Sequence, residues 1–308
     1  MRKGQGLRLG LALLGMTLGG CSLQSIAVDA IGDSLAGSGG SFASERDPEL
    51  VREALPFGLK TIEGLLEASP EHEGLLLAAA EGFCAYAYLL KEEADRREAT
   101  DLAAARDLRG RSRGFFLRGR DYALRALDGR HESFTATLRT DAAAALPPTT
   151  KDDAAFLYWA GAGWAGALSA DKGDLDLLAE LPLAGALVGQ VAVLDEGYDA
   201  GAAYEFLLSY EAGRPGGDLA LARAHYERAL ALSQGKRASL YLGLAESVAL
   251  TEANAVEFAA LLDSALAVDI DAVPQWRLVN VLAQRRALWL RARMPELFID
   301  FDDRESGA

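Results

Sequence analysis

Residues 219–233 read Leu-Ala-Leu-Ala-Arg-Ala-His-Tyr-Glu-Arg-Ala-Leu-Ala-Leu-Ser, and the spacing within this stretch decides the fold. Ala222, Tyr226 and Ala229 follow one another at intervals of four and three, which places them on one side of a helix. Small residues let a second helix approach closely, and the aromatic ring fills the groove between the two. The stretch therefore predicts a helix that packs against a partner helix.

Related spacings occur elsewhere in the chain, with one Ala-Leu pair close to one repeat length after this stretch and another close to three repeat lengths before it. The matching residues are Gly119, Ala123 and Ala126-Leu127 before this stretch, Ala265-Leu266 after it, and Trp159 with Ala162-Gly163 as an echo of a first helix. The tetratricopeptide unit is a helix pair of about 34 residues that buries its face by stacking on neighbouring units. We therefore predict an all-α fold of degenerate, tetratricopeptide-like antiparallel helix-pair repeats, with an irregular helical bundle as the alternative.

From Asp47 onward, alanine and leucine dominate and apolar residues recur at helical spacing. Asp47-Pro48 and Ser69-Pro70 each predict a capping side chain followed by proline at the first helical position. The predicted helices span 47–67, 70–99, 102–128, 133–144, 151–169, 174–197, 199–212, 217–233, 236–250, 253–268 and 273–293.

The N-terminus has the pattern of an export signal. Arg2, Lys3 and Arg8 precede an apolar stretch from Leu9 to Gly20, which is too short to span a bilayer as a stable anchor. Leu18-Gly19-Gly20-Cys21 resembles the lipobox of bacterial lipoproteins. We therefore predict a signal peptide over residues 1–20 and lipid attachment at Cys21, and this lipid is the only membrane attachment that we expect.

Three regions follow from composition. Residues 21–45 are rich in glycine and serine and predict a flexible tether, so residues 46–308 form the helical domain. Removing residues 1–20 changes the formal net charge from −14 to −17, which argues against nucleic acid as a partner. With Cys21 acylated, Cys84 is left without a disulfide partner, and we expect it to be a buried core residue.

Several stretches together resemble a known family. They are residues 47–63 (Asp-Pro-Glu-Leu-Val-Arg-Glu-Ala-Leu-Pro-Phe-Gly-Leu-Lys-Thr-Ile-Glu), Leu157-Tyr158-Trp159 with Trp164, and residues 179–183, 222–230 and 295–298. In these the chain resembles the tetratricopeptide lipoproteins associated with TRAP transporters, called the T component. The resemblance implies a helical repeat fold, association as a homotrimer with the periplasmic solute-binding protein of a TRAP transporter, and a cleft for an apolar small molecule. It brings no catalytic residues.

Aromatic residues mark a candidate ligand cleft. Phe156, Tyr158, Trp159 and Trp164 alternate with glycines, and Tyr86 and Tyr88 form a second group. Large rings beside residues without side chains indicate either close helix packing or a groove with an aromatic wall. We name Tyr86, Tyr88, Tyr158, Trp159 and Trp164 as the candidate cleft residues, with simple packing as the alternative.

Arginines cluster between residues 106 and 125, which is unusual in so acidic a protein. Arg111, Arg118 and Arg125 share one stripe of the predicted helix and are candidates for contact with an anionic partner. The alternative is pairing within the chain, because Glu92, Glu93, Asp95, Glu98 and Asp101 come just before them.

Signs of catalysis are weak. Gly32-Asp33-Ser34-Leu35 matches the nucleophile block of GDSL hydrolases, but Ser34 falls in the predicted tether, away from any strand that could hold an oxyanion site. His72, His131 and His225 are far apart and lack a second ligand at helical spacing. We therefore predict no enzyme, no metal and no cofactor.

The sequence thus favours a lipid-anchored, periplasm-facing scaffold that docks the solute-binding protein of a TRAP transporter and shelters or hands over an apolar solute. Ser22 after the cysteine, in place of aspartate, favours the outer membrane over the inner. The alternative is an envelope assembly scaffold that binds extended protein segments and has no transport role.

Overall fold

The computed structural model describes residue 37 and residues 39–298, and within these it has fourteen α-helices and no β-strand. The first half contains α2 (Gly39–Ala43), α3 (Pro48–Ala68), α4 (Glu73–Arg97), α5 (Leu102–Arg130), α6 (Phe134–Thr140), α7 (Ala142–Ala145), α8 (Ala154–Ala170) and α9 (Leu175–Leu194). The second half contains α10 (Ala202–Gly213), α11 (Leu219–Ser233), α12 (Ala238–Leu244), α13 (Ala255–Ala267), α14 (Arg277–Ala292) and α15 (Met294–Leu297). The all-α prediction is confirmed, whereas the repeat arrangement stays a prediction.

Cys21, the predicted signal peptide and the Gly32–Leu35 motif lie outside the described residues. Residues 39–43 of the predicted tether form α2, so this part of the segment is helical. The division of the chain at residues 20 and 45 therefore stays a prediction.

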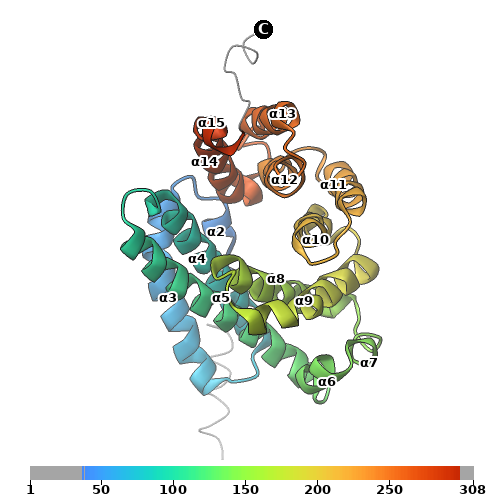
Figure 1. The fold of residues 1–308 in the computed structure, drawn as a ribbon. Coiled ribbons are helices and arrows are strands. Elements are labelled where there is room, and N and C mark those ends of the chain that lie inside the picture. Colours follow the sequence, from blue (N-terminus) through green and yellow to red (C-terminus); the bar gives the residue numbers. More distant parts are fainter. Residues whose placement is uncertain (1–36, 38, 299–308) are drawn as a thin grey trace, which may run out of the picture.

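The helices follow one another around a ring (Figure 1). α4 packs along α5, α5 along α8, and α8 along α9, after which α10 to α13 turn upward on the opposite side. α14 then returns beside α2 and α3, so the end of the described chain contacts its beginning. This closure creates the centre of the ring, where the candidate site lies.

Aspartates begin most of the long helices. The Asp47 side chain accepts hydrogen bonds from the backbone N–H groups of Glu49 and Leu50, with Pro48 at the first helical position, as predicted. The predicted start at Ser69-Pro70 is wrong, because α4 begins at Glu73 and His72 caps it through a hydrogen bond from the Leu75 N–H. The His72 imidazole accepts this hydrogen bond at 3.2 Å, so the cap lies three residues after the predicted one.

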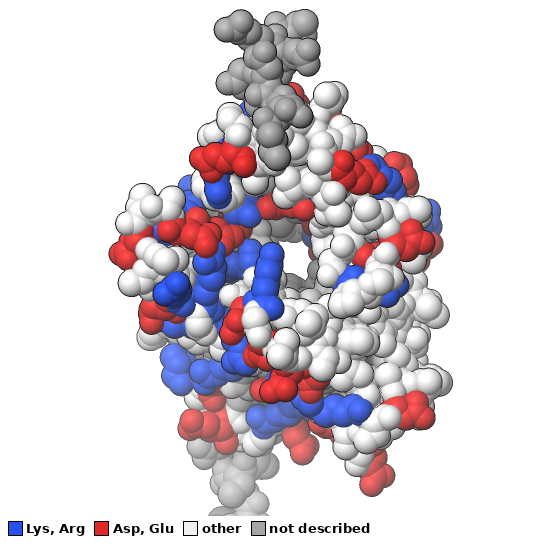
Figure 2. All heavy atoms as spheres, viewed as in Figure 1, with Lys and Arg blue, Asp and Glu red and all other residues white. Residues whose placement is uncertain are grey.

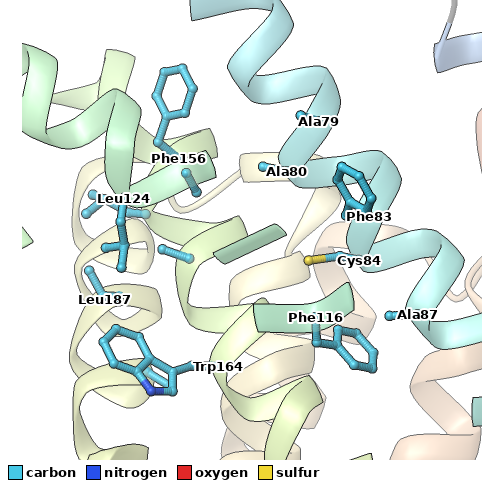
Figure 3. Packing of buried hydrophobic residues seen from close by; sticks show 14 of the residues in the cluster. Ala79, Ala80, Phe83, Cys84, Ala87, Phe116, Leu124, Phe156, Trp164 and Leu187 are labelled. Atoms are coloured by element: carbon cyan, nitrogen blue, oxygen red, sulfur yellow. The ribbon is translucent and has the colours of Figure 1, made fainter. Parts of the chain in front are cut away.

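The first hydrophobic core lies between α3, α4, α5, α8 and α9, and Figure 3 shows its centre. Its helices approach closely at glycines: a Cβ on Gly119 would lie 2.7 Å from Cys84 Sγ, and one on Gly163 would lie 2.8 Å from the Phe116 carbonyl oxygen. Cys84 is buried, as predicted. The small residues therefore set the distance between α4, α5 and α8.

A second core gathers α11 to α15 and is separate from the first. Ala222, Tyr226 and Ala229 are all buried in it, as the spacing of residues 219–233 predicts. Phe258 of α13 is fully buried there, with its ring edge-on to Phe298 at 5.2 Å. The described domain therefore has two cores, one for each half of the ring.

Two of the predicted helices are interrupted. Residues 133–144 divide at Asp141, which ends α6 and caps α7 by accepting from the Ala144 N–H at 3.1 Å. In residues 236–250, α12 passes into a π-helical turn, Ala245–Ala249. Such turns displace side chains from the regular helical register, and this one carries Glu246.

Candidate functional site: a charged and aromatic central cleft

Figure 2 shows an opening near the middle of the molecular face, which in Figure 1 is bordered by α8, α10, α12 and α14. α4 contributes the half-buried residues Glu81, Ala85, Tyr88 and Glu92, whose spacing of four, three and four places them on one side of the helix. Buried or half-buried aromatic and charged side chains from α8, α10 and α14, from the turn before α10 and from either end of α12 interact with this stripe or with one another. We call this set the central cleft, and its members are Glu81, Tyr88, Glu92, Tyr158, Trp159, Tyr198, Glu205, Arg237, Glu246 and Arg286.

Three aromatic rings form one wall. Tyr158 lies edge-on to Trp159 with ring centres 5.2 Å apart, and the Tyr198 ring lies 5.2 Å from Tyr158 on another side. The Trp159 indole N–H donates to Glu81 Oε1 at 3.0 Å, which joins α8 to α4. The wall is therefore apolar on its ring faces and fixed in orientation by a polar contact.

Arg237 stands at the start of α12 and is buried. Its guanidinium donates to the Asp199 carbonyl oxygen at 2.9 Å and to Asp199 Oδ2 at 2.6 Å, and Glu205 lies 3.6 Å away. The same guanidinium lies over the ring of Trp276 at 5.0 Å. Its Nε is buried without a hydrogen-bond partner among the described residues. Its charge is one of those that act on Tyr158.

Arg286 joins three elements on the α14 side of the cleft. It donates to Asp95 Oδ2 of α4 at 3.1 Å and to Glu246 Oε1 of the π-helical turn at 2.7 Å. It also lies over the Trp289 ring at 4.3 Å. Glu92 and Arg286 border a pocket that lies between α3, α4 and α14, and the other residues that line it are Pro48, Glu49, Arg52, Leu89, Arg96, Leu282, Arg285 and Trp289.

Burial acts strongly on the acids of the cleft. It raises the pKa of Glu81 against the lowering effect of the Trp159 hydrogen bond. It also raises the pKa of Glu92, against the attraction of Arg286 and Lys91. The pKa of Tyr158 is raised by burial and by the nearby Glu205 carboxylate. These groups therefore carry less of their charged forms than the same groups in water.

The arrangement suits binding better than covalent chemistry. Burial raises the pKa of the Cys84 thiol, so this thiol is not an activated nucleophile. Among the described residues no group of three or more histidine, cysteine or acidic side chains is placed to hold a metal ion. Ring faces flanked by carboxylates and guanidiniums offer an apolar surface with a few fixed polar contacts, as ligand clefts do.

A comparison with protein families decides where this chain belongs. Residues 44–298 match the family model of the TRAP transporter T-component, which covers the described domain almost entirely. The chain belongs to the TRAP transporter T-component family. It is also similar to an uncharacterized protein of Treponema pallidum (strain Nichols), at 27% identity over 303 residues that cover 91% of this chain and 94% of that protein. The family resemblance noted in the sequence is thereby confirmed.

The structure of this T-component separates the five predicted cleft residues. Tyr88, Tyr158 and Trp159 lie in the central cleft. Tyr86 is buried against α5, edge-on to the Phe115 ring at 5.1 Å. Trp164 is 1% exposed in the first core and donates its indole N–H to Glu180 Oε2 at 2.9 Å.

The three predicted partner-binding arginines of the T-component are all exposed on α5. Figure 2 shows Lys and Arg side chains gathered to the left of the opening. Arg118 pairs with Glu63 and lies over the Phe83 ring at 4.7 Å. Arg111 approaches the Tyr86 hydroxyl at 3.4 Å. Within residues 39–298 neither Arg111 nor Arg125 makes an ion pair, so of the three only Arg118 is paired with an acid.

Sequence reasoning missed the charged members of the cleft, which are Glu81, Glu92, Glu205, Arg237, Glu246 and Arg286. For Glu81 and Glu92 a signal was available, because they are acids on an otherwise apolar stripe of α4. Arg237 offered none, since its partners Asp199 and Trp276 come from other parts of the chain.

Proposed function

We propose that this T-component is a lipid-anchored scaffold, attached through Cys21 and facing the periplasm, that docks the solute-binding protein of its TRAP transporter. In this proposal the central cleft shelters a solute that passes between the two proteins. The single observation that carries the solute-handling part is the cluster of the Tyr158, Trp159 and Tyr198 rings, held to Glu81 of α4, in a protein of a TRAP transporter family. The apolar body of a solute would lie on these rings.

The outer face of α9 is the docking surface that we propose. Leu175 is 74% exposed and Val193 is 79% exposed, and Pro182 lies exposed between them. Figure 2 shows few charged side chains over the C-terminal part of α9, to the lower right of the opening. Contiguous apolar surface of this kind is common where proteins bind other proteins. By length and composition alone, α9 is also long and apolar enough to cross a membrane, and so is the mainly buried α4.

Co-purification tests the docking. We expect the full-length protein, solubilised from its native membranes, to bring down a solute-binding protein, and Val193→Glu to reduce the recovered partner at least about tenfold, because a charge would be desolvated in the interface. Val256→Glu is the matched control, since Val256 of α13 is 81% exposed on the other half of the ring. Recovery without a solute-binding protein, or equal loss in both variants, would contradict the proposal.

Labelling of the attached lipid tests the proposed anchor at Cys21 separately. We expect the wild-type protein grown with labelled palmitate to carry the label and to sediment with outer membranes, and Cys21→Ser to do neither. Label on Cys21→Ser would show that the attachment is elsewhere.

A further inference from the structure

The two halves of the ring are independently packed. The first core holds residues of α3 to α9, and the second holds those of α11 to α15. α10 joins them, because its neighbouring residues Leu207 and Leu208 belong to the first and the second core respectively. Apart from Leu282 of α14, which is buried in the first core, each half has its own buried apolar surface, and we call them the first lobe and the second lobe.

On the other side of the ring the lobes meet along a seam made mainly of charges. Arg285 of α14 donates to both carboxylate oxygens of Glu49 in α3, at 3.0 and 2.8 Å. Arg277 donates to the Ser44 carbonyl oxygen at 2.6 Å, and Arg46 pairs with Asp271. Arg286 and Asp95 complete the seam at its buried edge.

Apolar packing across the seam is thin. Leu282 of α14 is buried in the first core, and Leu278 is partly buried against it. Beside them lies the pocket between α3, α4 and α14, so the contact is incompletely filled. Ion pairs at partly exposed positions add little stability and weaken with salt, whereas a filled apolar interface does not.

We propose that this seam is a gate: the second lobe swings about α10, the contacts of Arg285, Arg277 and Arg286 part, and the central cleft opens sideways. This movement withdraws only Leu282 and Leu278 from the first core and leaves the rest of both cores packed, which is why the ring opens here and not elsewhere. The movement itself does not depend on the proposed function. Only its role, the entry and exit of the solute, rests on that function.

Hydrogen exchange of the full-length protein tests the gate without partner or solute. We expect Arg285→Glu, which places two carboxylates together at the seam, to speed amide exchange in α14 about threefold to tenfold while exchange in α8 stays unchanged. Arg291→Glu is the matched control, because Arg291 lies on the same helix but pairs with Asp263 inside the second lobe. The double change Arg285→Glu with Glu49→Arg should restore the slow rate.

Salt provides a second measurement on the unchanged chain. Raising NaCl from about 0.05 M to about 0.5 M should speed exchange in α14 relative to α8. Spin labels on Leu50→Cys and Leu288→Cys, at positions 53% and 58% exposed, should then show a second, longer distance. A single distance at both salt concentrations, or equal exchange in the Arg285 and Arg291 variants, would overturn the gate. Neither result depends on whether a solute-binding protein co-purifies.

Discussion

Trp159 donates its indole N–H to Glu81 Oε1 at 3.0 Å across a sequence separation of 78 residues. The contact ties α8 to α4 at the wall of the central cleft and places a carboxylate beside three aromatic rings. This hydrogen bond also lowers the pKa of Glu81, against the larger raising effect of burial.

We expect Trp159→Phe to lower the free energy of unfolding by about 1–3 kcal/mol, because Glu81 would keep its burial and lose its donor. The pKa of Glu81 should rise further. Urea denaturation measures the first effect. In the Glu81→Gln background the loss should be smaller, and an equal loss in both backgrounds would show that the two side chains are not coupled.

Glu92→Gln should stabilise the protein near neutral pH. The pKa of Glu92 is raised by burial, so the native state keeps the proton over a pH range in which the unfolded state has lost it. The free energy of unfolding therefore falls as the pH rises from the unfolded-state pKa through the folded-state pKa, and glutamine removes this loss. Thermal unfolding midpoints at neutral pH and near about pH 4 test it, with a smaller gain expected at the lower pH.

Glu93→Gln is the matched control for that prediction. The Glu93 carboxylate, next to Glu92 in the chain, accepts a hydrogen bond from Arg97 at 2.5 Å and lies 3.3 Å from Arg52. Replacing Glu93 should therefore lower the thermal unfolding midpoint at neutral pH. A change of the same sign in both variants would contradict the assignment of Glu92 as an acid without a compensating pair.

Gly163→Ala should destabilise the first core by about 1–3 kcal/mol, because its Cβ would lie 2.8 Å from the Phe116 carbonyl oxygen and 2.9 Å from the Arg120 backbone nitrogen. Gly114→Ala on α5 has open space around its Cβ and should stabilise by about 0.5–1 kcal/mol through helix propensity. Chemical denaturation of both variants checks the signs. Stabilisation by Gly163→Ala would mean that α5 and α8 lie farther apart than described.

Asp153→Asn should destabilise at neutral pH by about 1–3 kcal/mol, because Arg130 at 2.9 Å loses one of its two carboxylate partners and keeps the other, Glu73. The pKa of Asp153 is lowered, with the Thr150 N–H and Arg130 outweighing burial. A depressed folded-state pKa contributes stability that is fully present above the unfolded-state pKa and is lost as the pH falls through the folded-state value. The difference between wild type and variant should therefore shrink in acid, and a constant difference down to about pH 2 would contradict this assignment.

The sequence predicts the helices well because their signals are local. Asp47-Pro48 starts α3, and the stripe of Ala222, Tyr226 and Ala229 faces the second core. Which face of α8 borders the cleft and which is buried could not be predicted from such local signals. Its residues are apolar all round, so no periodicity distinguishes Tyr158, which borders the cleft, from Trp164, which is buried on the other side.

The charged half of the cleft depends on contacts between distant parts of the chain. Arg237 meets Asp199 and Trp276, which lie 38 residues before it and 39 residues after it. Arg286 meets Asp95 across 191 residues. No local pattern in a single sequence indicates that residues so far apart will meet, so only the tertiary arrangement brings them together.

The hydrogen bond from Arg277 to the Ser44 carbonyl oxygen also decides where mechanical tension would enter the domain. A pull on the chain before residue 39 reaches α2 first, then the backbone at Ser44, and through Arg277 the start of α14. The load would fall on the two ends of the folded chain together and bypass the aromatic wall. Tension applied between the start of the described chain and α9 would thus stretch the contact of Arg277 with Ser44 before either core yields.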